Sequence, residues 1–594
     1  MSFAKKSFFL LWIFFFIPNP EVQSQNVTIH DSIEGIIRAV QNTGGLWIGC
    51  EHIHAHKPLK VLYQNRNFEP FWITPSGPSS LGLELFDFLA DAGSHGLNPH
   101  DYHFSCIRKW FESIDQRKDA GRTIGKKELA GLDIVMTDAF LNFGFHLAAG
   151  KVDPKSIFPQ WFVEKNKVDI FDALNRLCPE KSSVKRVLKC LAPPHPDYWQ
   201  MVKAAKGLKT VQEAEGWPMI PKGQLLRPGD ISSRVIPLSR RLCMEGYLPH
   251  GLYEEQKQFD RNLVDAVKAF QANHGLVIDG IVGPNTLKAL NVPAGERRKQ
   301  ILINLERWRW LPRNLGEQHI RVNIAAFTLN AVNRGIERLA MRVIVGKNYQ
   351  KTPLFSKKMA YVQFNPYWNV PRSIVKEELL PKFKADPDYM IKNHYELVDG
   401  WNPESPVISS GDIQWESVHV RNFPGRIRQL PGPWNAMGRV KFMFPNQFNV
   451  YLHDTSSSSR HLFQKANRAL SHGCIRVEKP VDLAVFLLRD SPDWNRRRIE
   501  AVIQNGQQLA VPVPGRCMVH LLYYTAWMND EGKINYRRDI YGRDAILWDA
   551  LQRLPADGAP AKPNSDPVLK DYSLELECHP LCATRSGQVP HQYE

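Results

Sequence analysis

A short segment of the chain, Ser471-His472-Gly473-Cys474-Ile475-Arg476, combines residue types that suit nucleophilic catalysis. A cysteine attacks a carbonyl carbon as the thiolate, so its thiol needs a nearby base or cation that lowers its pKa. Imidazole fills that role near neutral pH. A second imidazole, His453, ends an apolar segment that predicts a strand, which would hold the ring beside the turn of Cys474.

Gly473 adds a backbone feature that attack on a carbonyl needs. Because it has no Cβ atom, the chain can approach a substrate closely, and the amides of Gly473 and Cys474 would then stabilise a developing oxyanion. Zinc is a competing interpretation, with Cys474, His472 and His453 as three ligands. We disfavour it, since His472 and Cys474 stand too close in sequence and no fourth ligand has the usual spacing. An isolated cysteine or histidine is commonly a structural residue. Because these residues occur together in one motif, we disfavour the structural interpretation here.

The elements that must position this motif are predicted strands. Apolar and polar residues alternate in four segments, which is typical of half-buried strands: 319–330, 341–346, 361–364 and 440–444. A polar, charged interval without a clear strand interrupts them and predicts an inserted lid or subdomain. We therefore assign residues 296–555 to a mainly β domain with a lid at about 376–435, and residues 556–594 to a flexible tail.

The residues before this domain predict helices. Apolar residues recur at intervals of three and four in segments such as Leu81 to Ala92 and Leu129 to Ala149, so residues 25–230 indicate a helical scaffold domain. Residues 231–295 predict a small bundle, in which Pro284 follows a glycine-containing turn and opens a helix. The fold class expected for the whole chain is multidomain α+β.

The amino terminus predicts export. Lys5 and Lys6 precede an apolar run from Phe8 to Ile17, and Val22 and Ser24 suit the −3 and −1 positions of a cleavage site. We interpret residues 1–24 as a signal peptide. An uncleaved amino-terminal anchor is the alternative, and no later segment has the length and apolar character of a membrane span.

The amino-acid composition limits the classes of binding partner that the protein can have. The formal net charge of +16 favours nucleic acid, an anionic membrane surface or a wall polymer that bears carboxylates. Export would separate the protein from nucleic acid, so the wall and the membrane surface are the better candidates. The nine cysteines allow up to four pairs and one free thiol in an oxidising compartment, and their spacing does not assign the pairs. We interpret Cys578 and Cys582 as structural or without a role.

The segment from Tyr451 to Val477 resembles the active-site motif of the YkuD-type L,D-transpeptidases, in which a histidine precedes Ser-His-Gly-Cys. The resemblance covers most of the chain, and segments similar to signatures of the large periplasmic members lie at 304–310, 345–347, 365–371, 523–527 and 539–541. Three further segments, 266–271, 274–276 and 279–287, are similar to a peptidoglycan-binding-like three-helix module. Such a module would tether the enzyme to its polymer, and a spacer that binds nothing is the alternative.

The resemblance implies roles for the residues of the motif. Cys474 is similar to the family nucleophile, and His453 is similar to the general base that accepts and donates the proton. His472 would be a supporting residue that orients or polarises the site. The Gly473 amide would stabilise the oxyanion, and Arg476 would face a substrate carboxylate.

Other residues are implied at the substrate, with alternatives. Tyr451, Trp368 and Asn365 are substrate-binding candidates by the resemblance, although core packing is an equally good interpretation for Tyr451 and Trp368. The interval between His453 and Cys474 is longer than the family pattern, which makes His461 a competing base.

The resemblance implies an L,D-transpeptidase that forms 3–3 cross-links between peptidoglycan stem peptides. A tetrapeptide donor would lose D-alanine and form a thioester on the cysteine, without a metal or cofactor, and carbapenems would acylate the same thiol. The expected partners are stem peptides and other wall-synthesis enzymes in the periplasm, with no nucleic acid and with membrane contact only through an uncleaved signal. The alternatives are a carboxypeptidase or exchange enzyme and a catalytically inactive wall-binding scaffold.

Overall fold

The computed structural model describes residues 27–39, 46–159, 161–163, 166, 168–177, 183–249, 251, 255–386, 388–400 and 404–553. The predicted signal peptide and carboxy-terminal tail lie outside these residues, as do Cys578 and Cys582. Among the described residues, Cys474 is a cysteine that forms no disulfide. Within the described part of the chain, no helix combines the length and the apolar character needed to cross a bilayer. The fold divides into two compact units, one formed by residues up to 83 with 105–139 and one by 84–104 with 140 onward.

The first unit consists of helices and two short hairpins. Its elements are α1 (Ile29–Ala39), β1 (Leu46–Ile48), β2 (Glu51–Ile53), α2 (His56–Asn65), β3 (Ile73–Thr74), β4 (Gly77–Pro78), the start of α3 (Ser80–Ala90), most of α4 (Phe104–Asp119) and the first part of α5 (Lys126–Ala149). The carboxylate of Asp133 is buried and accepts hydrogen bonds from the Tyr63 hydroxyl and the Trp72 amide at 2.6 and 2.7 Å. These bonds satisfy a charge that burial would otherwise make costly.

Helices also begin the second unit, which confirms the predicted helical character of this region. The short elements are η2 (Ala92–His95), η3 (Pro99–Tyr102), α6 (Pro154–Ile157), α7 (Ile170–Asn175) and α8 (Val184–Leu191), followed by α9 (Pro196–Glu213). Helix α9 packs against α13 (Ala294–Arg309), where the buried Arg309 guanidinium pairs with Glu306 at 2.5 Å. One strand was not expected here: β5 (Trp161–Phe162) joins the edge of the large sheet beside β9.

Three described helices form the small module: α10 (Val235–Met244), α11 (Arg261–Asn273) and α12 (Pro284–Leu290). Asp260 caps α11, because its carboxylate accepts a hydrogen bond from the Leu263 amide. The Gln271 side chain holds the following turn by accepting from the Gly280 amide and donating to the Ile281 carbonyl. The expected helix start at Pro284 is confirmed.

A hairpin connects this module to the rest of the second unit. Strands β21 (Ala526–Met528) and β22 (Ile534–Tyr536) pair antiparallel, and the Tyr536 ring stacks on His274 of the module. The Lys533 ammonium donates to the Glu245 carbonyl at 3.0 Å, and the Arg537 guanidinium donates to the Asn273 carbonyl at 2.8 Å. Several polar contacts therefore hold the module in place.

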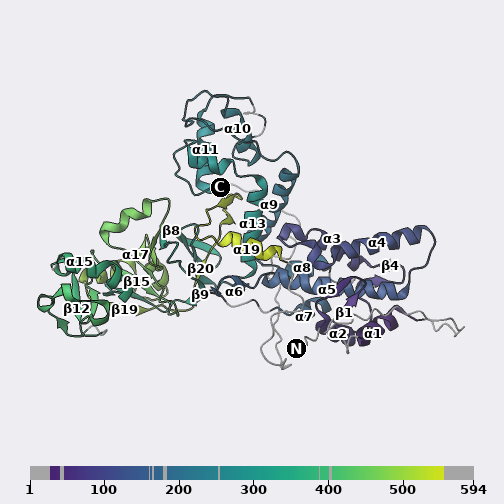
Figure 1. The fold of residues 1–594 in the computed structure, drawn as a ribbon, viewed down its shortest axis with the longest axis horizontal. Coiled ribbons are helices and arrows are strands. Elements are labelled where there is room, and N and C mark those ends of the chain that lie inside the picture. The colour runs from purple at the N-terminus through teal and green to yellow at the C-terminus, as the bar shows by residue number, and fades with distance from the viewer. Residues whose placement is uncertain are drawn as a thin grey trace, which may run out of the picture. The chain divides into compact units, whose positions relative to one another are not determined.

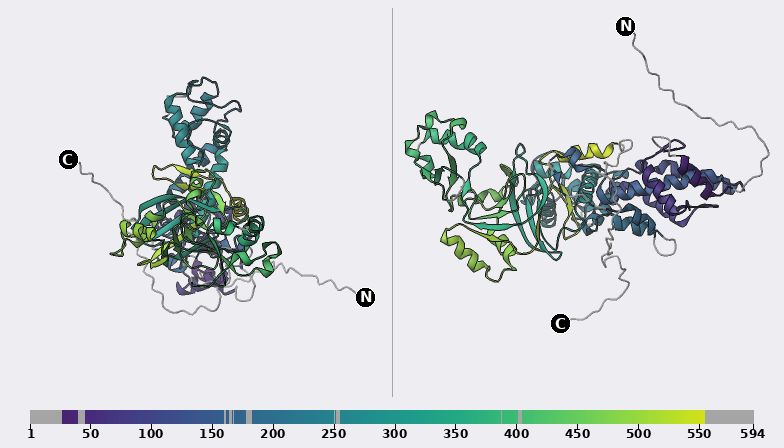
Figure 2. Two further views of the ribbon diagram at one scale, coloured as in Figure 1. Left: turned by 90° about the vertical axis from the view of Figure 1, so that its left-hand side faces the viewer. Right: turned by 90° about the horizontal axis from the view of Figure 1, so that it is seen from below.

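Twelve described strands form the large sheet, which curls around an apolar interior (Figure 2). After β5, they are β6 (Gln318–Asn323), β7 (Thr328–Asn333), β8 (Ile336–Gly346), β9 (Leu354–Lys358), β10 (Tyr361–Phe364), β15 (Val440–Met443), β16 (Leu452–His453), β17 (Ala469–Ser471), β18 (Ile475–Val477), β19 (Leu509–Pro512) and β20 (Cys517–Leu522). Helices α17 (Pro480–Leu488), α18 (Arg496–Asn505) and α19 (Arg543–Gln552) accompany it, and η8 (Ser457–Gln464) precedes β17. The alternating segments are thus strands, and 319–330 forms a hairpin of two.

The predicted lid is a small subdomain with its own core and sheet. It contains β11 (Trp368–Asn369), α14 (Arg372–Ile374), η4 (Val375–Leu379), α15 (Leu380–Ala385), α16 (Tyr389–Lys392), β12 (Tyr395–Val398), β13 (Val407–Ile408), η5 (Ser410–Asp412), η6 (Trp415–Ser417), η7 (Val420–Asn422) and β14 (Arg426–Gln429). We call residues 368–429 the lid; α15 and β12 lie together in it (Figure 1). Two details correct the sequence prediction, because the lid's first strand precedes residue 376 and the interval does contain strands, in the order β11-β14-β12-β13.

Candidate active site

The large sheet places the histidine strand directly beside the cysteine strand. Strand β16 pairs parallel with β18, with Leu452 opposite Ile475 and His453 opposite Arg476. The Ile475 amide donates to the Tyr451 carbonyl at 3.1 Å, which extends this register back to Tyr451 and Cys474. His453 therefore lies two residues along the neighbouring strand from Cys474, about 8 Å away between Cα atoms at ordinary strand spacings. That separation is within reach of an imidazole and a thiol that lean towards each other.

Alternation along these strands assigns the side chains to two faces. Leu452, Ile475 and Val477 point into the apolar core of the sheet. Since successive side chains alternate, Tyr451, His453, Cys474 and Arg476 share the other face, where the Tyr451 and His453 rings lie 5.7 Å apart. Strand β15 adds Lys441 to this group, because Lys441 pairs with His453 and its ammonium lies 4.1 Å from the centre of the Tyr451 ring.

Cys474 is half-buried, and its environment acts on the thiol in two directions. Burial raises the pKa of the Cys474 thiol above its ordinary value and is the largest influence. Hydrogen bonds from the backbone and hydroxyl of Tyr451, together with the charges of Lys441 and Arg476, lower that pKa. The thiol contacts the Asn449 carbonyl at 3.7 Å. In the resting structure the sulfur is thus a neutral thiol with cations near it, whereas the sequence motif suggested a lowered pKa.

His453 is buried and electrically neutral. Burial lowers the pKa of its imidazole from 6.5 to about 3, and the nearby charges of Arg476 and Lys441 act in the same direction. Among the described polar atoms that are buried without a hydrogen-bond partner, two belong to this face: His453 Nδ1 and Arg476 Nε. A neutral imidazole can accept a proton, so the geometry suits a base better than a resting imidazolium.

The turn of residues 471–474, here called the cysteine turn, is held from both sides. The Ser471 hydroxyl donates to the Cys474 carbonyl at 2.5 Å and accepts from the Gly473 amide at 3.2 Å. The Thr352 hydroxyl donates to the Gly473 carbonyl at 2.8 Å. Gly473 has a φ of +118°, which an L side chain would strain, and Gly346 lies against it. Because the Gly473 amide already bonds Ser471, it is open to an oxyanion only if that bond yields.

His472 contacts the lid. Its Nε2 lies 2.7 Å from Oε1 of Glu378, on η4, and both side chains are partly exposed. The Glu378 charge also reaches Arg476, where it opposes the lowering of the guanidinium pKa by burial. Within the described residues, Cys474, His472 and His453 form no group that would hold a metal ion.

Comparisons with known families bear directly on this region. Residues 317–499, which contain the whole cysteine and histidine face, match the family model described as "L,D-transpeptidase catalytic domain", named YkuD. The chain carries a YkuD-type L,D-transpeptidase catalytic domain. Residues 232–290 match a "Putative peptidoglycan binding domain" and residues 57–204 match a "Scaffold domain". The transpeptidase domain is therefore part of a multidomain protein.

Individual relatives cover only parts of the chain. A "Putative L,D-transpeptidase" of Haemophilus influenzae is 37% identical over 263 residues, which are 43% of this chain and 51% of that protein. The chain thus spans about half the length of this relative. The N-acetylmuramoyl-L-alanine amidase CwlL of Bacillus licheniformis is 30% identical over 247 residues, 36% of this chain and 67% of that protein. A solved L,D-transpeptidase from Xylanimonas cellulosilytica is 19% identical, covers 51% of this chain and 98% of its own, and gives a TM-score of 0.17.

Two residues expected at the substrate site, Asn365 and Trp368, have clear contacts within the transpeptidase domain. Asn365 is buried, and its amide nitrogen donates to the Val502 and Gln507 carbonyls at 2.9 and 3.1 Å. This amide ties two parts of the domain together, and the substrate contact expected of Asn365 stays a prediction. Trp368 packs in the lid, with its ring 6.4 Å from that of Tyr395. Core packing, the alternative given for Trp368, describes its observed surroundings.

Two further residues clarify the histidine strand of the transpeptidase domain. His461, the competing base, is exposed on η8 and its ring nitrogen contacts the Ser458 carbonyl at 2.8 Å. Lys441 was missed by the sequence analysis, although it occupies a polar position in the alternating segment 440–444. Its closeness to His453 and Cys474 arises from strand pairing between distant segments, which local alternation does not reveal.

Proposed function

We propose that this protein is an L,D-transpeptidase that forms 3–3 cross-links between peptidoglycan stem peptides through a thioester on Cys474. The observation that supports this most is the shared face of β16 and β18, which groups a thiol, a neutral imidazole and a guanidinium. This arrangement supplies a nucleophile, a base and an anion-binding group beside one another, as acyl transfer from a carboxylate-bearing peptide requires.

In the first half-reaction, His453 would accept the proton of the Cys474 thiol while the sulfur attacks the carbonyl carbon of the third stem residue. The new C–S bond produces a tetrahedral oxyanion. We assign the backbone amide of Cys474 as the hydrogen-bond donor to this oxyanion. Collapse of this intermediate breaks the C–N bond to D-alanine. His453 returns its proton to the departing amine, which leaves a thioester and a neutral imidazole.

In the second half-reaction, the amine of a neighbouring stem would attack the thioester carbonyl. His453 would accept a proton from that amine as the C–N bond forms, and the C–S bond would break with return of the proton to sulfur. If water were the acceptor, the product would be a shortened stem, and a free D-amino acid would give exchange. The acceptor thus decides between transpeptidase, carboxypeptidase and exchange activity.

Charge and domain content support a wall substrate. Lys441 and Arg476 flank Cys474, and stem peptides carry several carboxylates, so the site and the substrate have complementary charge. The match to a peptidoglycan binding domain at 232–290 suits a protein held near the polymer that it modifies. Together these features support a proposed location outside the cytoplasm, in the periplasm.

The decisive experiment incubates purified protein with a disaccharide tetrapeptide and follows the products by mass spectrometry. We expect dimers and free D-alanine from the wild type and neither from Cys474→Ala. Shortened monomers without dimers would favour the carboxypeptidase, whereas unchanged substrate with a folded protein and an accessible thiol would favour the inactive scaffold. Carbapenem treatment followed by intact-mass measurement tests the first half-reaction alone. The mass of the wild type should increase by that of one covalently bound inhibitor.

A further inference from the structure

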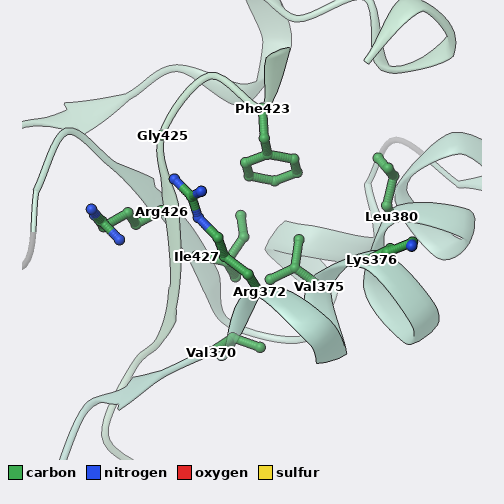
Figure 3. Close-up of a pocket in the computed structure, with 9 residues that line it drawn as sticks. All are labelled: Val370, Arg372, Val375, Lys376, Leu380, Phe423, Gly425, Arg426 and Ile427. Atoms are coloured by element: carbon green, nitrogen blue, oxygen red, sulfur yellow. The ribbon is translucent and has the colours of Figure 1, made fainter. Parts of the chain in front are cut away.

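The lid contains a hollow that the active-site face does not include. Its apolar wall is made by Val370, Val375, Leu380, Phe423 and Ile427, and with its mouth it encloses about 400 Å³. Figure 3 shows the Phe423 ring on one side of the hollow, with Val375 and Ile427 facing it from the other.

Cations surround this apolar wall. Arg372, Lys376 and Arg426 are the charged residues that line the hollow, and no acidic residue lines it. Arg372 and Lys376 are exposed, and within the described residues neither side chain forms an ion pair with a carboxylate. Figure 3 shows the Arg372 guanidinium rising beside Gly425 at one edge. A ligand that fits this hollow therefore carries negative charge together with small apolar groups.

One turn of helix connects the hollow to the cysteine turn. Val375 and Lys376 line the hollow, and Glu378, later in the same π-helical turn η4, contacts His472 at 2.7 Å. Glu378 follows Val375 by three residues, which is less than one full π-helical turn. Single π-helical turns are unusual and occur frequently at functional sites. A ligand in the hollow would thus lie close to the residues that flank Cys474.

We propose that this hollow binds the acceptor stem peptide of the transfer reaction, an inference that rests on the proposed function. Its carboxylates would pair with Arg372 and Lys376, and its alanyl methyl groups would contact Val375, Phe423 and Ile427. The donor stem has a different cation, Arg476, beside the sulfur, so the two peptides would use separate charges. The acceptor amine could then extend towards the thioester while the rest of the acceptor stays in the lid.

The test separates acylation from transfer. The double variant Arg372→Gln/Lys376→Gln is compared with Arg421→Gln/Lys382→Gln, which removes two exposed lid cations that do not line the hollow. With the first variant, half-maximal dimer formation should need about tenfold more acceptor, because charge-assisted hydrogen bonds to the peptide are lost. Thioester formation from donor alone should stay within about twofold of wild type. Unchanged acceptor dependence, or an equal loss of acylation and transfer, would overturn the assignment.

A binding measurement decides the hollow independently of turnover. Full-length Cys474→Ala protein is titrated with a stem tetrapeptide by calorimetry, and two binding events are expected. When the same protein also carries Arg372→Gln/Lys376→Gln, only one binding event is expected. Identical titrations would overturn the inference. If the wild type never acylates, the proposed function fails, yet this titration still tests the hollow. Should the double variant not fold, Arg372→Gln alone takes its place in both measurements.

Discussion

Glu378 of the lid lies 2.7 Å from His472 of the cysteine turn, measured between Oε1 and Nε2. Two residues far apart in the chain thus connect the lid to the segment that carries the nucleophile. Because both side chains are partly exposed, the pair contributes only about 0–1 kcal/mol to folding. Its importance would lie in holding the lid over the thioester, where exclusion of water protects the acyl-enzyme.

Glu378→Gln should loosen this contact and admit water to the thioester. We expect the ratio of hydrolysed monomer to cross-linked dimer to rise by about threefold, which corresponds to a change of about 0.7 kcal/mol in relative barrier heights. Product ratios from the muropeptide assay measure it. Glu377→Gln is the matched control, because this neighbouring carboxylate is exposed and should leave the ratio unchanged.

His453→Ala should slow acylation of Cys474 by about 10²–10⁴-fold, the usual contribution of a positioned base. His461→Ala should have no comparable effect, since that ring is exposed and contacts only a local carbonyl among the interactions that the described residues show. Intact-mass measurements of carbapenem acylation over time report both rates. If acylation were slow in His461→Ala and normal in His453→Ala, His461 would be the base instead.

Much of this arrangement could be predicted from the sequence because it depends on local patterns. The alternation at 361–364 and 440–444 is a local property, and it yielded strands β10 and β15 with close bounds. The motif around Cys474 is also local. Lys441 and Glu378 were not predicted as neighbours of the site, because antiparallel pairing and lid placement bring them there from distant segments. The burial of Asn365 and its bond to the Val502 carbonyl were likewise not predicted, because they depend on the packing of a distant helix.

The pH dependence of acylation should reflect the neutral resting pair. Since burial lowers the pKa of His453 to about 3, protonation of this base should not reduce the rate between pH 8 and pH 5. The raised pKa of Cys474 should make the rate increase on the alkaline side. Acylation rates across pH 4–10 check both limbs. A rate that halves near pH 6.5 would contradict the burial of the base.

The same depressed pKa affects stability. Unfolded His453 binds a proton below about pH 6.5, whereas the folded protein does so only near pH 3. The unfolded state therefore binds more protons in this window, and stability should fall as pH drops from about 6.5 towards 3. Urea midpoints of His453→Gln should show a weaker decline over this interval than those of wild type.

Gly346→Ala should disturb the cysteine turn. A Cβ atom at this position would collide with the Gln350 carbonyl oxygen and lie 3.1 Å from Gly473 Cα. We expect a loss of about 1–3 kcal/mol in unfolding free energy and a marked fall in acylation rate. Gly335→Ala is a suitable control for stability loss alone, because its φ of +72° would strain an alanine while a Cβ there meets no atom within 4 Å. It should lose stability while acylation stays normal.

Lys441→Met should slow acylation by about threefold to tenfold, because the ammonium charge lowers the pKa of the Cys474 thiol and its loss would favour the neutral form. The alkaline rise in rate should move to higher pH in this variant. Lys441→Arg keeps the charge and should remain closer to wild type, which separates an electrostatic role from packing against Tyr451. If both variants slowed acylation equally, side-chain shape would matter more than charge. Lys441 would then not activate the thiol through its charge.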